Sequence, residues 1–166
     1  MTHHPKRNLQ VLGSIDINET SYHRKMLRES TRYGLGFAWP EPISREDPIL
    51  IELQAICELN ECTPKLRDRV GGYSNPFYLC GAGSITPHED TGLGWTINAL
   101  VSTKDLSKNF QSGDEVNSCT LLAQGRHIIV QEGDVFLLNT NIEHTWVANC
   151  RWLLVGQGVT LKKAIK

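Results

Sequence analysis

Residues 119–159 read CTLLAQGRHIIVQEGDVFLLNTNIEHTWVANCRWLLVGQGV, and this stretch is the most informative about the fold. It contains five short runs rich in β-branched and aromatic residues, a composition typical of β-strands. Small and polar residues separate the runs, and Gln124-Gly125 and Gly133-Asp134 have the composition of tight turns. The stretch therefore predicts consecutive short strands.

Three runs of the same kind precede this stretch. We therefore expect eight strands, at residues 76–80, 84–90, 94–101, 119–124, 126–131, 134–139, 143–147 and 151–159. Eight short strands in succession favour a sandwich or a jelly-roll barrel. The expected fold class is thus mainly β, with the helices gathered near the N-terminus.

The first 72 residues carry the helical signals. One helix is expected at 19–32 and a clearer one at 46–60, with Pro48 in its first turn, where proline is tolerated. In the second helix, apolar residues recur with helical period, at Ile49, Leu53, Ile56 and Leu59. Such a stripe needs an apolar partner, so we expect this helix to cover the outer face of the larger sheet.

The length of 166 residues suits a single domain, with 1–72 as a helical support region and 73–160 as the barrel core. Apolar residues make up 40% of the chain, which is ordinary globular usage. The net charge of −1 does not indicate nucleic acid as a partner. No run of about 18 apolar residues is present, so no membrane span is expected.

Five cysteines occur at irregular spacings, without a CxxC pair. This pattern does not indicate a zinc knuckle. Reduced, mostly buried thiols in a cytoplasmic protein are the simplest interpretation.

His88 and Asp90 are the residues most indicative of chemistry. One residue separates them, so in an extended segment both side chains point to the same face. His88 is also the only histidine with an acidic residue two positions on. With His144 as a third ligand they would form a two-histidine, one-carboxylate site, which leaves three coordination positions open and is typical of non-haem Fe(II) oxygenases. The alternative is that the three are ordinary polar residues of the core or surface.

The stretch from Tyr78 to Val159 resembles the double-stranded β-helix core of the Fe(II)/2-oxoglutarate-dependent oxygenases. The matching pieces are PHED (87–90), GDVFLLN (133–139), EHTW (143–146) and the basic residue Arg151. The resemblance implies a cupin-like jelly-roll barrel that binds iron through His88, Asp90 and His144, the catalytic residues. It also implies a dioxygenase that hydroxylates a substrate with O₂ and 2-oxoglutarate, giving succinate and CO₂.

The resemblance further implies that Arg151 binds the distal carboxylate of 2-oxoglutarate and that Tyr78 helps to hold it. A two-residue hairpin at Ala148-Asn149 would place Arg151 on the face of Trp146 and His144, pointing into the barrel. The sequence departs from the family where Leu153 stands in place of a common serine or threonine. The alternatives are a surface role for Arg151, with Arg126 as a substitute, and a core role for Tyr78 with a hydrogen-bonded hydroxyl.

Asn98 and Trp146 also have two interpretations, as core residues or as parts of the pocket. Two rival functions remain open for the whole protein: a cupin-type metal enzyme that uses no 2-oxoglutarate, and a non-catalytic barrel that acts as a binding module. The sequence does not identify the substrate, which the resemblance allows to be a small molecule, an amino-acid side chain or a nucleobase.

Overall fold

The computed structural model describes residues 9–17, 19–29, 37–38, 43–64, 76–90, 94–105 and 117–161. Two helices lie in this part, α1 (Ser21–Glu29) and α2 (Pro48–Leu59). The strands are β1 (Leu9–Ser14), β2 (Phe37–Ala38), β3 (Cys62–Pro64), β4 (Phe77–Ala82), β5 (Ile85–His88), β6 (Trp95–Asp105), β7 (Cys119–Ala123), β8 (Arg126–Val130), β9 (Asp134–Asn139), β10 (His144–Ala148) and β11 (Cys150–Leu161).

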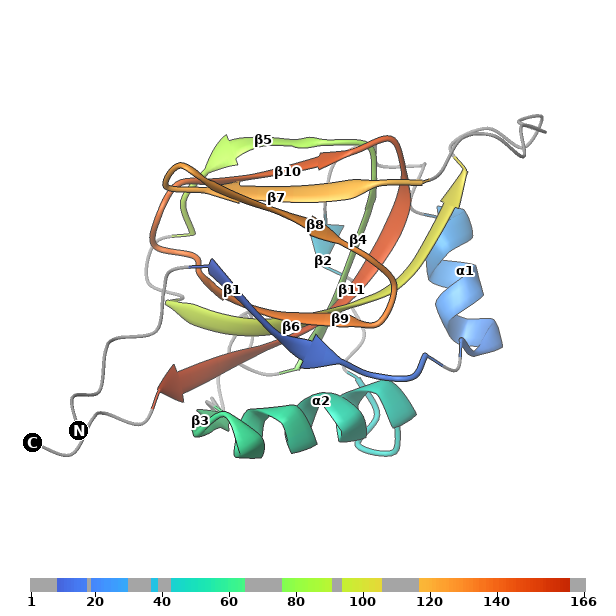
Figure 1. Ribbon diagram of the computed structural model, residues 1–166. Helices are drawn as coiled ribbons and strands as arrows, with labels where there is room; N and C mark the ends of the chain where they lie inside the picture. Colours follow the sequence, from blue (N-terminus) through green and yellow to red (C-terminus); the bar gives the residue numbers. More distant parts are fainter. Residues whose placement is uncertain are drawn as a thin grey trace, which may run out of the picture.

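The strands form two antiparallel sheets that face each other (Figure 1). The larger sheet has the order β1-β9-β6-β11-β4-β2, with β3 paired to β11, and the smaller has the order β5-β10-β7-β8. From β4 onward the chain therefore crosses repeatedly between the sheets. Among the eight strands from β4 to β11, the larger sheet has the order β4-β11-β6-β9 and the smaller sheet has the order β5-β10-β7-β8. Numbered 1 to 8 along the chain, these orders are 1-8-3-6 and 2-7-4-5. This is the order of a jelly-roll barrel, and it confirms the expected fold class.

All eight strands predicted from the sequence are present, within a few residues of their expected bounds. The space between the sheets is filled by side chains that alternate along each strand, among them Leu121 of β7, Phe136 of β9, Trp146 of β10 and Trp152 of β11. This inner cluster is one of the two hydrophobic cores that the described residues form.

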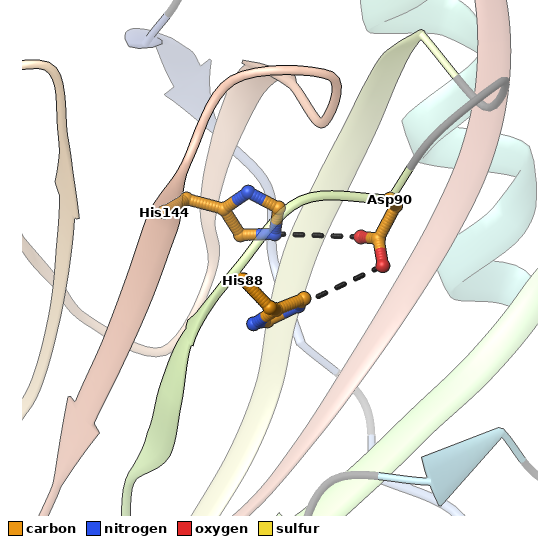
Figure 2. Close-up of side chains that lie close together, drawn as sticks. All are labelled: His88, Asp90 and His144. Atoms are coloured by element: carbon orange, nitrogen blue, oxygen red, sulfur yellow. Dashed lines mark ion pairs between the residues drawn. The ribbon is translucent and has the colours of Figure 1, made fainter.

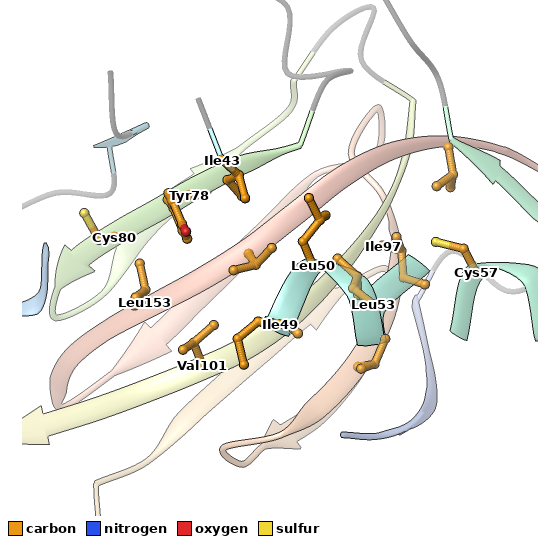
Figure 3. Packing of buried hydrophobic residues seen from close by; sticks show 14 of the residues in the cluster. Ile43, Ile49, Leu50, Leu53, Cys57, Tyr78, Cys80, Ile97, Val101 and Leu153 are labelled. Atoms are coloured by element: carbon orange, nitrogen blue, oxygen red, sulfur yellow. The ribbon is translucent and has the colours of Figure 1, made fainter. Parts of the chain in front are cut away.

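The second core lies on the outer face of the larger sheet, beneath α2 (Figure 3). Ile49 and Leu53 of α2 are fully buried there against Ile97 and Val101 of β6 and Leu153 of β11. The predicted position of this helix is therefore confirmed.

The expected stripe on α2 was wrong at Leu59, whose side chain is 82% exposed. At 3.6 residues per turn, Leu59 projects roughly 120° away from Leu53, whereas Ile49 and Cys57 project within roughly 40° of it. The buried face of α2 is therefore centred on Ile49, Leu53 and Cys57, all of which are fully buried.

Asp47 fixes the start of α2 and joins it to two other elements. Its Oδ1 accepts hydrogen bonds from the backbone N–H groups of Ile49 and Leu50, at 2.8 and 3.4 Å, which makes Asp47 the N-cap. Its Oδ2 accepts from His23 Nε2 of α1, at 3.1 Å, and from the hydroxyl of Tyr78 of β4. One buried carboxylate thus ties both helices to the larger sheet.

The N-terminal region is not only a helical support. Leu9–Ser14 pairs with β9, Phe37–Ala38 with β4 and Cys62–Pro64 with β11, so three short strands from this region extend the larger sheet. All five cysteines are buried and none forms a disulfide, as expected. No helix among the described residues is long and apolar enough to cross a membrane.

Candidate metal centre

The two histidines of the candidate site are direct neighbours across the smaller sheet. His88 ends β5 and His144 begins β10, and the two residues are paired in the antiparallel ladder. Directly opposite residues on one sheet face bring their side chains together, and the two imidazole centroids are 4.3 Å apart. The pairing of β5 with β10 therefore joins two residues that are 56 positions apart in the sequence.

Asp90 completes the cluster from the segment that follows β5. Its backbone N–H donates to the carbonyl of Thr140 at 2.8 Å, which fixes the chain there. Asp90 Oδ1 lies 3.7 Å from His88 Nε2, and Oδ2 lies 3.4 Å from His144 Nε2 (Figure 2). The ligand atoms of the three residues all lie within 4.8 Å of one another. The structure thus brings together the three residues singled out in the sequence, and they could hold a metal ion.

Both imidazoles are held in the orientation that a metal ligand needs. Nδ1 of His88 is 2.8 Å from the carbonyl oxygen of Thr86, and Nδ1 of His144 is 2.8 Å from that of Ile142. A carbonyl only accepts, so each Nδ1 carries the proton. In the neutral ring each Nε2 then has a free lone pair directed at the shared centre. A backbone carbonyl bound to the far nitrogen is the usual arrangement of metal-binding histidines, so the donor set fits a metal ion.

The electrostatics of the cluster favour a carboxylate beside two imidazoles. The hydrogen bond with His144 outweighs burial and holds the pKa of Asp90 below its ordinary value. Burial works to lower the pKa of His144, but the hydrogen bonds to Asp90 and to the Ile142 carbonyl outweigh it and raise that pKa. Asp90 is therefore ionised at neutral pH, and without metal its carboxylate is hydrogen-bonded with His144.

The cluster lies at the mouth of a pocket between the two sheets. The pocket encloses about 180 Å³ and is lined mainly by apolar residues of β4, β7, β9, β10 and β11. His88 and Asp90 are partly exposed, while His144 is buried. A ligand entering this pocket would therefore pass the cluster, and a metal ion held there would border both solvent and pocket.

Arg151 does not line this pocket, contrary to the sequence hypothesis. On β11 the even-numbered residues Trp152 and Leu154 line the pocket, whereas the odd-numbered residues Leu153 and Val155 belong to the core beneath the helices. Arg151 is odd-numbered and therefore lies on the side of the sheet away from the pocket. The hairpin on which the hypothesis relied is absent, because β10 belongs to the smaller sheet and β11 to the larger. Crossing between sheets at Asn149 keeps even-numbered residues facing inward and turns Arg151 to the outer face.

Tyr78 also faces away from the pocket. It is buried beneath the helices and its hydroxyl bonds Asp47, while Phe77 and Leu79 of the same strand line the pocket. The alternative of a core aromatic with a hydrogen-bonded hydroxyl is the correct one. Arg126, the suggested substitute, is an exposed residue at the β7–β8 turn, also outside the pocket.

The pocket contains residues that sequence reasoning did not single out. Phe77 and Thr140 line it, and Gly156 of β11 lies against the ring of Phe77. A glycine within a strand often marks a place where another group lies close to the backbone. Gly156 could therefore have been recognised from the sequence as a position of close packing. Phe77 and Thr140 carried none, because their position depends on which sheet each strand joins. Asn98 and Trp146 do line the pocket, which is one of the two interpretations given above.

Comparison with protein-family models and with curated proteins finds no match. Among solved structures, the chain is similar to a cupin-2 domain containing protein from Shewanella frigidimarina, at 12% identity and a TM-score of 0.34. The similarity covers 49% of this chain and 67% of that chain. A similarity of this size carries no argument about function, and the fold assignment rests on the strand order of the chain itself.

Proposed function

We propose that this protein is a mononuclear non-haem iron oxygenase that binds Fe(II) through His88, Asp90 and His144. The observation that carries the proposal is the convergence of these three ligand atoms within 4.8 Å at the mouth of a pocket. Two histidines and one carboxylate on one side of an ion leave three positions open, which suits iron that must bind O₂ and a further ligand. Bound iron would supply the activation of O₂ for oxidation of a substrate in the pocket.

The chain's own residues would supply position and exclusion of water. The carbonyls of Thr86 and Ile142 hold the imidazoles in place, and the backbone bond to Thr140 holds Asp90. Trp146 shares a face with His144 and walls the pocket beside it. The apolar lining keeps the reacting part of a substrate away from bulk water.

The proposal has two forms, which differ in whether the iron uses 2-oxoglutarate as a cosubstrate. 2-Oxoglutarate is supported by the three open positions, two of which its keto acid end would fill. Its distal carboxylate needs a cation, yet none of the described residues that line the pocket is lysine or arginine. We therefore place first the form in which the iron acts without 2-oxoglutarate, the cupin-type alternative given above, and keep the 2-oxoglutarate-dependent dioxygenase second.

Nitric oxide tests the first part of the proposal, because it binds Fe(II) in the position of O₂ and gives a characteristic electron paramagnetic resonance signal. Protein loaded anaerobically with one equivalent of Fe(II) should give this signal, and the His144→Ala variant should not. The His127→Ala variant, changed at an exposed histidine of β8, should behave like the parent. A parent protein that binds Fe(II) without giving the signal would contradict an open oxygenase site.

Anaerobic addition of 2-oxoglutarate to the same loaded protein decides between the two forms. The first form predicts no visible charge-transfer band and no succinate after air is admitted. A band together with succinate would establish the second form. Arg151→Ala then shows whether the outward arginine takes part, and from its position we expect no effect.

A further inference from the structure

The pocket below the metal centre has walls that suit an apolar ligand. Its sides are formed by Phe77 and Leu79 of β4, Phe136 of β9, and Trp152 and Leu154 of β11. These side chains face the space between the sheets because they alternate with residues that face outward. Contact with such walls favours a ligand with a flat or compact apolar body.

Within the described part of the chain, the lining of this pocket offers no lysine or arginine and no carboxylate outside the metal cluster to neutralise a charged ligand. Among the described residues that line it, the ionisable groups are His88, Asp90 and His144, which already face one another. Burying a charge without a partner is costly, so a ligand that passes below the cluster should be neutral.

Asn98 of β6 offers one hydrogen-bond acceptor inside this apolar space. The hydroxyl of Thr96 donates to the carbonyl of Leu138 at 3.4 Å, so its oxygen accepts from Asn98 Nδ2 at 3.0 Å. This network sets the amide with nitrogen toward Thr96 and leaves Oδ1 of Asn98 to accept from a ligand. The residue is buried at 5% exposure, so bulk water does not readily satisfy this oxygen.

Trp146 offers the complementary donor. Its indole N–H is buried and has no hydrogen-bond partner among the described residues, although the ring lines the pocket. The other tryptophan of the pocket differs, because the indole N–H of Trp152 donates to the carbonyl of Gly83 at 2.8 Å. A buried donor without a partner is unfavourable, and a ligand that supplies an acceptor would relieve it.

From these observations we infer that the pocket takes a small neutral molecule with a largely apolar body and an amide-like pair of one donor and one acceptor, recognised by Asn98 Oδ1 and Trp146 Nε1–H. The inference deepens the proposed function and rests on it for the reaction that such a molecule would undergo. Binding itself needs only the pocket, and can be measured on the metal-free protein.

Three probes with the same ring and different charge test the inference: benzamide, benzoate and benzamidine. In calorimetric titrations of the metal-free full chain, benzamide should bind about tenfold or more tightly than either ion, since only the neutral probe avoids burying an unpaired charge. Equal or tighter binding of benzoate, or no measurable binding of benzamide, would overturn the inference.

Tryptophan resonances locate the bound probe. In proton–nitrogen correlation spectra, benzamide should shift the indole N–H signal of Trp146, identified by its loss in Trp146→Phe, more than that of Trp152, whose N–H is already bonded. Asn98→Leu should weaken benzamide binding about three- to tenfold, the loss of one net hydrogen bond, and leave toluene binding unchanged. Ser102→Ala, which removes a buried hydroxyl of the same strand outside the pocket, should have no effect.

The outcomes separate this inference from the proposed function. Benzamide selectivity without Fe(II) binding would contradict the iron oxygenase and leave the inference intact. Fe(II) binding with a preference for benzoate or 2-oxoglutarate over benzamide in the metal-free protein would contradict the inference alone. Should Asn98→Leu fail to fold, the charge series and the Trp146 shift on the parent still decide the inference.

Discussion

Gly156 is the residue at which the pocket depends most on the absence of a side chain. A Cβ atom there would lie 2.4 Å from Cζ of Phe77 and 2.9 Å from Oδ1 of Asn98. Both distances are below ordinary contact, and the easiest response is a movement of the Phe77 ring into the pocket. Gly156→Ala should therefore destabilise the fold by about 1–3 kcal/mol, as overpacking does, and reduce benzamide binding. Urea unfolding and calorimetry measure the two effects.

A double variant identifies the cause. In a Phe77→Leu background the added methyl group meets a smaller and more adaptable neighbour, so Gly156→Ala should cost less than it does in the parent. An equal cost in both backgrounds would show that the ring of Phe77 is not what excludes a side chain at position 156.

Helix α2 contains two leucines of opposite exposure, which together test how the helix packs on the sheet. Leu53 is fully buried against the larger sheet and Leu59, in the last turn, is 82% exposed. Leu53→Ala should lower the free energy of unfolding by about 2–5 kcal/mol, because it leaves a cavity beneath the helix. Leu59→Ala should change it by less than about 0.5 kcal/mol. Similar losses for both variants, measured in urea, would mean that the buried face of α2 is wrongly placed.

The Asp47 link between α1, α2 and β4 should make stability depend on pH. Burial alone would raise the pKa of Asp47, but the hydrogen bonds that its carboxylate accepts from His23, Tyr78 and the Ile49 N–H outweigh it and lower that pKa. A pKa that is lower in the folded than in the unfolded protein stabilises the fold above the unfolded value, near 3.8. This stabilisation is lost as the pH falls through the folded pKa.

The corresponding variant is Asp47→Asn, which keeps the cap and removes the titrating group. The parent should lose stability below about pH 4 more steeply than the variant does, measured as the urea midpoint from pH 7 to pH 2. Parallel curves would show that ionisation of Asp47 does not contribute. Ser44→Ala serves as the control, because it removes a hydroxyl that accepts an exposed hydrogen bond from the Glu46 N–H and keeps the backbone bond from the Asp47 N–H to the Ser44 carbonyl.

In the molecule as a whole, the features that depend on local sequence pattern could be predicted from the sequence. The eight barrel strands follow from composition and turns, and the meeting of His88 with Asp90 follows from the period of an extended chain. Which sheet a strand joins depends on contacts distant in sequence, so the crossing at Asn149 was not visible and Arg151 was assigned to the wrong face. Strand β1 was not predicted, and its pairing with β9 is irregular between Val11 and Gly13.

The convergence of His88, Asp90 and His144 depends on the whole jelly roll, because only the crossing of the chain between sheets brings β5 beside β10. We propose that these three residues together hold one metal ion. Glu89 and His127 provide matched controls, since both are exposed and neither belongs to the cluster, although Glu89 lies between two of its members.

Anaerobic titration with Fe(II), read by calorimetry and by bound iron after desalting, shows whether His88, Asp90 and His144 hold the metal. The parent and the Glu89→Ala and His127→Ala variants should each bind one Fe(II) per chain. His88→Ala, Asp90→Ala and His144→Ala should each weaken binding by about tenfold or more, because two ligands cannot replace three. Undiminished binding in any of these three variants, or no binding in the parent, would contradict the account.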